Sequence, residues 1–265
     1  MIQTSFINPF PIPGVSIPDG LVFWHKLEDA TQGDEINGTE FYYTNNLSYQ
    51  SCKFNDGFYA DDSNSPSIIM LAHKDGYESL YDLLGTGTPS EFCIEFWVKY
   101  TDFDIVDGCA DDGASEHRIL FSARQGKTDH NSSAFSLIHR SESAYGLRFS
   151  VKDTNDFYII NNDTTLDISQ NSLVHWAYSY KESGFTTNVQ HHIYQDNALK
   201  YELGDSSWGG YDFENDQSGE NLIAFGKNSF SYDSSSRDCA NIVFDNIKIW
   251  NYAKTDFSDK DNEGY

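Results

Sequence analysis

The carboxylate with the clearest chemical implication is Asp245, which lies inside the alternating segment Asn241 to Lys254. Alternation predicts a strand in which Asp245 shares a buried face with Val243, Ile247 and Ile249. An unpaired charge out of water is costly, so this carboxylate needs a proton, a hydrogen-bond donor or a cation. Two roles are open: a ligand to a metal ion, or an acceptor for backbone N–H groups near a wet end of the strand.

A second suggestive pair is Glu95 with Trp97, on one face of the predicted strand Glu91 to Thr101. The residues that alternate with them are apolar and predict the core face. A pyranose offers an apolar ring face and a rim of hydroxyls, so a Trp beside a carboxylate is a suitable platform for a sugar. The same pattern also fits an ordinary solvent face on which one Trp is covered.

A third candidate is the polar loop Gly204 to Gly219, which contains Trp208, Tyr211 and Phe213. Aromatic side chains among Gly, Asp and Asn are typical of loops that contact ligands. We expect this loop to form a contact surface, with a lid that folds back on the domain as the competing interpretation.

Motifs that would indicate an enzyme or a standard calcium loop are missing from the sequence. The acidic loop Asp102 to Asp112 misses the EF-hand spacing by one residue, and its twelfth position is Gly113 rather than Glu. The chain also lacks the serine-hydrolase elbow, the phosphate-binding loops and the zinc-protease motif. The sequence therefore predicts a protein without catalytic activity.

The elements that would position these residues are short strands separated by turn residues. Segments of this kind recur every 8 to 14 residues or so, which is typical of a β-sandwich, and helix is nearly absent. A length of 265 residues fits one large all-β domain. At Asp196-Asn197 both residues tolerate positive φ, which predicts a tight hairpin turn.

Several segments, in their order along the chain, resemble the concanavalin A-like lectin and glucanase superfamily and its laminin G-like jelly rolls. The segments are Gly20 to Ala30, Glu91 to Thr101, Ser172 to Lys181 with His175 and Ala177, His191 to Tyr201, Asn221 to Lys227, and the final strand with its Asp-x-Ile-x-Ile-aromatic-Asn pattern. The resemblance implies a two-sheet antiparallel jelly-roll sandwich over residues 20–265, with His175 structural. The paired-carboxylate motif of the glucanases is missing, which again argues against glycosidase chemistry.

The resemblance also implies a structural calcium ion between the first and last strands. Asp245 matches the usual aspartate of that site, and Asp29 and the loop at Gly57 are the counterparts from the first half of the chain. The ion would hold the two ends of the sandwich together.

Charge and hydropathy restrict the partners. Acidic residues outnumber basic ones by 41 to 17, and the resulting net charge of −24 repels nucleic acid and anionic lipid while attracting divalent cations. No apolar run is long enough to span a bilayer, and the first residues lack the features of a signal peptide. Residues 1–19 hold four prolines and read as an extended arm, which either docks on a neighbouring subunit, including a second copy of this chain, or packs on its own sandwich.

These observations lead to a functional expectation: a non-catalytic adhesion protein of a virion, such as a phage capsid or tail appendage. It would decorate the particle or contact glycans on a host surface. The alternatives are a free or cell-surface carbohydrate-binding module and a purely structural decoration protein that binds no sugar.

Overall fold

The computed structural model describes residues 17–28, 36, 43–44, 48–60, 69–72, 84, 90–101, 110–111, 115–124, 133–140, 146–152, 157–162, 171–187, 189–204, 222–225 and 242–263. The predicted arm up to residue 16, Asp29, and the loop with Trp208, Tyr211 and Phe213 lie outside these residues. The elements described are all strands. Among the described residues, no helix is long and apolar enough to cross a membrane.

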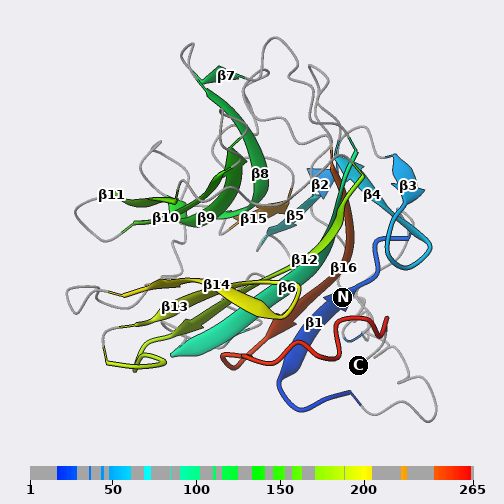
Figure 1. The fold of residues 1–265 in the computed structure, drawn as a ribbon. Coiled ribbons are helices and arrows are strands. Elements are labelled where there is room, and N and C mark those ends of the chain that lie inside the picture. The colour runs from blue at the N-terminus through cyan, green and yellow to red at the C-terminus, as the bar shows by residue number, and fades with distance from the viewer. Residues whose placement is uncertain are drawn as a thin grey trace, which may run out of the picture.

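The strands form two antiparallel sheets that lie one above the other (Figure 1). Sheet A has the order β14 (Ala198–Leu203), β13 (His191–Gln195), β12 (Leu173–Lys181), β6 (Glu91–Tyr100), β16 (Ile242–Trp250), β4 (Asp56–Ala60) and β3 (Tyr49–Ser51), with β1 (Leu21–His25) also paired to β16. Sheet B has the order β11 (Phe157–Asn162), β10 (Gly146–Lys152), β9 (Ser133–Arg140), β8 (Ser115–Arg124), β15 (Leu222–Phe225), β5 (Ile69–Ala72) and β2 (Tyr43–Thr44), with β7 (Ala110–Asp111) on β8. The predicted all-β sandwich is confirmed.

Aromatic side chains fill the space between the sheets. The ring of Phe225 on β15 lies 5.6 Å from that of Phe96 on β6 and 5.9 Å from that of Phe244 on β16, measured between centroids. Edge-to-face contacts of this kind add to the free energy gained by burying the rings. The three fully buried phenylalanines therefore fasten sheet B to the central strands of sheet A.

The final strand contains a bulge that changes which face its residues occupy. Asp245 lies opposite Trp97 and Lys248 lies opposite Glu95, so β16 advances three residues where β6 advances two. Asn246 absorbs the extra residue with a φ of 53°, a conformation that Asn adopts more readily than most residues. The expectation that Asp245 shares a face with Ile247 and Ile249 is therefore wrong.

The hairpin between β13 and β14 has the turn expected from its sequence. Asp196 and Asn197 have φ values of 51° and 69°, both in the left-handed region. Two consecutive residues of this kind match the right-handed twist of the flanking strands. The backbone N–H of His175 also donates to Asp196 Oδ1, so the turn is tied to β12.

Candidate functional site

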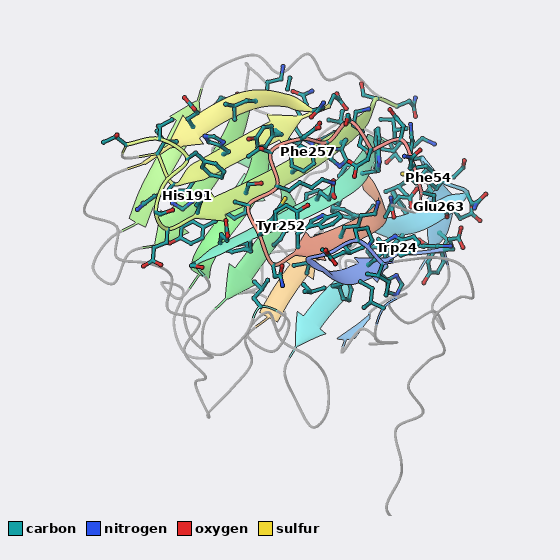
Figure 2. All side chains as sticks on the ribbon, turned by 90° about the horizontal axis from the view of Figure 1, so that it is seen from below. Trp24, Phe54, His191, Tyr252, Phe257 and Glu263 are labelled. Atoms are coloured by element: carbon teal, nitrogen blue, oxygen red, sulfur yellow. The ribbon has the colours of Figure 1, made fainter. Side chains whose placement is uncertain are left out.

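The side of sheet A that faces away from sheet B, here called the outer face, is covered by the end of the chain. Residues 251–263, here called the strap, leave β16 without regular structure and run back across the outer face, past Tyr252 and Phe257 to Glu263 (Figure 2). Phe257 is fully buried in an apolar cluster on this face. The cluster consists of Leu21, Trp24, Cys93, Ala177, Tyr194, Trp250 and Phe257.

A buried ionic cluster lies beside these apolar residues, with Glu95 of β6 at its centre. The Glu95 side chain is about 3% exposed, and its Oε1 accepts hydrogen bonds from Trp250 Nε1 at 2.6 Å and Lys254 Nζ at 2.9 Å. Its Oε2 lies 3.0 Å from His175 Nε2. Lys254 Nζ also contacts both carboxylate oxygens of Asp259 at 3.0 Å. Glu95 therefore meets three potential donors, one from each of two neighbouring strands and one from the strap.

These contacts decide the charge of Glu95. Burial alone would raise its pKa, but the hydrogen bond and electrostatic interaction with His175, together with the charge of Lys254, outweigh burial and lower the pKa to about 2. Burial likewise works against the charge of Lys254, and Glu95 and Asp259 more than offset this and raise its pKa. Lys254 and Glu95 form a buried ion pair at neutral pH.

Trp97 is covered by the same strap. It is 4% exposed, its Nε1 donates to the carbonyl of Lys260 at 3.0 Å, and Nζ of Lys53 and Lys260 lie 4.4 and 5.2 Å from its ring. Trp97 is thus covered, as in the second of the two interpretations of this face, and the strap is what covers it. A role for Glu95 and Trp97 in binding a sugar stays a prediction that requires the strap to move aside.

Asp245 lies where two strands meet end to end. β4 pairs with β16 at Ile242–Phe244, and β1 pairs with β16 from Ile247 onward, which leaves Asp245 between them. Its Oδ2 accepts a hydrogen bond from the Phe54 N–H at 2.7 Å, in the turn that joins β3 to β4. The expected backbone acceptor role is therefore observed for one oxygen. The other, Oδ1, is buried and has no hydrogen-bond partner.

The surroundings of Asp245 disfavour its charge. Burial, together with the negative charges of Glu263 and Glu28, exceeds the effect of the hydrogen bond from Phe54 and raises the pKa of Asp245 to about 7. A proton or a cation at Oδ1 would give this oxygen a partner, and it would also offset the repulsion from Glu263 and Glu28.

Of the other two residues expected at a calcium site, the structure describes only Gly57. Gly57 in β4 is buried, and a side chain there would clash with Val243 and with the carbonyl of Phe244, so close packing against β16 explains this glycine. Asp29 is outside the described residues. Across the described ranges, no three His, Cys, Asp or Glu side chains are placed to hold a metal ion. Calcium therefore rests on Asp245 alone and stays a prediction.

Sequence reasoning missed the partners of Glu95. His175 was expected to be structural, and its contact with Glu95 agrees with that expectation, but Lys254 and the strap were not anticipated. One signal was present: Glu95 and His175 both interrupt otherwise apolar or aromatic strands. Charged and basic side chains at such positions need partners of opposite charge.

Comparisons with known proteins show the fold. No family model and no curated protein matches the chain. The binding domain of botulinum neurotoxin serotype G aligns with a TM-score of 0.55 and 13% identity, over 88% of this chain and 48% of that structure. The D/C serotype binding domain gives 0.54 and 16%, over 92% and 51%. A Trypanosoma rangeli sialidase in complex with 2,3-difluorosialic acid gives 0.58 and 10%, over 97% and 36%.

This chain thus spans about a third to a half of the length of these structures. Identities this low show the fold alone. The chain has the β-sandwich fold found in these toxin binding domains and in the sialidase, and the narrower assignment to the concanavalin A-like superfamily remains a prediction.

Proposed function

We propose that the chain is a non-catalytic adhesion domain that contacts glycans. The observation that supports this most is the likeness in fold, over about nine-tenths of the chain, to binding domains of two neurotoxins and to a sialidase in complex with 2,3-difluorosialic acid. The arrangement of Glu95 agrees with a role other than catalysis. Its carboxylate is ionised and bound to Trp250, His175 and Lys254. These contacts suit it to stabilise the fold rather than to transfer a proton.

The contact surface that we propose is the loop with Trp208, Tyr211 and Phe213. The strap covers the outer face of sheet A, and the inner face packs against Phe225 of sheet B, so a sugar cannot reach the central strands of sheet A directly. Aromatic residues in a polar loop can stack on a pyranose ring while neighbouring polar groups bind its hydroxyls.

The setting that we propose is a particle surface, in a virion or on the outside of a cell. The arm at residues 1–19 would dock on other subunits, or on a second copy of this chain, and the sandwich would present its loops outward. A free or cell-surface carbohydrate-binding module differs in needing no assembly partner. A structural decoration protein differs in binding no sugar, and copurification with a particle separates it from the free module.

A glycan array tests the proposal and its site together. We expect the full chain to bind a restricted set of glycans, and Trp208→Ala to lose at least about fivefold in affinity, since stacking on one aromatic ring is worth ~1 kcal/mol or more. Leu199→Ala, on the exposed edge strand β14, is the matched surface control and should bind normally. Absence of binding to any glycan would favour the structural decoration protein.

We also propose that Asp245 binds a structural Ca²⁺, because its Oδ1 is buried without a partner. The folded protein holds a proton on Asp245 up to a pH of about 7, whereas the unfolded chain releases it near 3.8. Stability should therefore fall as pH rises through this window, by several degrees in Tm, and Asp245→Asn should remove that part of the slope.

Calorimetry with calcium or with a chelator at pH 8 separates the ion from the proton. Calcium should raise the Tm of the parent and leave Asp245→Asn and Asp245→Ala unchanged. Identical melting curves in calcium and chelator, for the parent as well as the variants, would contradict the calcium proposal while leaving the pH effect intact.

A further inference from the structure

The ammonium group of Lys254 lies in surroundings that suit an alkylammonium ion. Glu95 Oε1 is 2.9 Å away and both Asp259 oxygens are 3.0 Å away, so carboxylates on two sides accept hydrogen bonds from the ammonium. The ring centroids of Trp250 and Phe257 lie 4.3 and 5.1 Å from Nζ. Carboxylates combined with aromatic ring faces are the groups that proteins use to bind alkylammonium ions.

Two of the groups around the ammonium, Glu95 and Trp250, belong to the sheet, and the other two, Asp259 and Phe257, belong to the strap itself. Glu95 is on β6, His175 is on β12 and Trp250 is on β16, three strands that pair in the order β12–β6–β16. Trp250 Nε1 and His175 Nε2 contact Glu95 independently of Lys254. The Glu95 side of the site is therefore held in place by the sheet, and Lys254 is its occupant.

A second contact lies three residues further along the strap. The ring of Phe257 lies 4.9 Å from that of Tyr194 and 5.6 Å from that of His175, between centroids, and is fully buried. Ala177 and Cys93 belong to the same apolar cluster. An ammonium contact and an aromatic contact are thus separated by two intervening residues of the strap.

Side chains of the sheet and its hairpin also bind the backbone of the strap. Ser179 Oγ donates to the carbonyl of Lys254, and Trp97 Nε1 donates to the carbonyl of Lys260. The N–H of Phe257 donates to Asn197 Oδ1 in the hairpin turn. Pockets for individual side chains are among the means by which domains recognise extended peptide ligands, and the strap is held by such contacts together with isolated backbone hydrogen bonds.

We propose that the outer face of sheet A is a peptide-binding surface for a Lys-x-x-aromatic segment, and that residues 254–260 are its resident ligand, bound within the same chain. The surface recognises an alkylammonium group at Glu95 and an aromatic ring at Tyr194. A segment from another molecule could use the surface only after the strap has left it. This inference is independent of glycan binding.

Chemical rescue tests the ammonium site. In Lys254→Ala the site loses its occupant while Glu95, Trp250 and His175 stay in place, and added propylammonium chloride should bind there. At about ten times its dissociation constant, the amine should raise the Tm of the variant by roughly 3 to 5 °C above the same concentration of sodium chloride. Wild type and the exposed-lysine control Lys200→Ala should not respond. Lys254→Met, which fills the site with an apolar chain, and Lys254→Ala with Glu95→Gln should not respond either.

The site can also be tested if Lys254→Ala folds poorly. In that case the yield of folded protein on refolding is compared between propylammonium chloride and sodium chloride. Higher yield with propylammonium for Lys254→Ala alone would support the site. Equal Tm and equal yield in the two salts would overturn the proposal. An equal response in Lys200→Ala would also overturn it, since the amine would then be acting as a general cosolute.

Discussion

Lys254→Met is expected to lower the free energy of unfolding by about 3 to 5 kcal/mol. The substitution removes the ammonium that lies 2.9 Å from Glu95 and leaves a buried carboxylate with less compensation. Removing one partner of a buried ion pair costs more than the pair itself contributes, because the remaining charge stays out of water. Denaturant unfolding at pH 7 measures the loss.

A double-mutant cycle identifies the cause of that loss. Glu95→Gln neutralises the carboxylate but keeps an oxygen for Trp250, so Lys254→Met combined with Glu95→Gln should be more stable than the sum of the single losses predicts. Lys200→Met, at an exposed position of β14, should change stability by less than about 0.5 kcal/mol. Strict additivity of Lys254→Met and Glu95→Gln would show that the two charges are not coupled.

The pH of the measurement matters because Glu95 has a lowered pKa. Its contribution is fully present above its ordinary pKa of 4.5 and is lost as pH falls toward about 2. Asp245 behaves in the opposite way, since burial raises its pKa to about 7. The two carboxylates on the outer face thus favour folding in different pH ranges. At pH 7 the contribution of Glu95 is fully present, whereas Asp245 is near its own pKa.

Local patterns were sufficient to predict the strands of the fold. Period-two alternation indicated the strands at Glu91–Tyr100 and Leu173–Lys181, and turn chemistry indicated the hairpin at Asp196-Asn197. These signals are local, because the pleat and the φ preference of single residues produce them. Both strands and the hairpin turn are present in the structure.

The faces of the final strand could not be predicted in the same way. A single residue with positive φ, Asn246, shifts the pairing of β16 on β6 and moves Asp245 to the outer face. Nothing in the alternation marks that residue, because the bulge depends on tertiary contacts such as the hydrogen bond from Trp24 Nε1 to Asn246 Oδ1.

The ionic cluster around Glu95 could not be predicted from the sequence for a related reason. His175 lies 80 residues and Lys254 159 residues from Glu95 along the chain, and only the sheet order brings them together. The strap has no periodicity, because side chains of the sheet bind it instead of a partner strand. Its apolar and charged anchors therefore leave no regular pattern in the sequence.

Phe257→Ala is expected to cost about 3 to 5 kcal/mol, since it removes a fully buried aromatic ring from the outer apolar cluster. Phe185→Ala is the matched control: that ring stacks on His192 at 3.7 Å but is only half-buried, so its loss should be clearly smaller. Denaturant unfolding compares the two. A cost below about 1 kcal/mol for Phe257→Ala would mean that the strap contributes little to the folded state.

Combining Phe257→Ala with Lys254→Met shows whether the strap acts as one unit. If either substitution releases the whole strap, the second has little left to remove, and the double variant should lose much less than the sum of the single losses. Independent anchors would instead give additive losses. Less-than-additive behaviour is expected, because Lys254 and Phe257 lie on one short, irregular segment. The Ser179 side chain donates to the carbonyl of Lys254, and the Asn197 side chain accepts from the N–H of Phe257. The strap would then leave or cover the outer face as a whole, as a peptide ligand does.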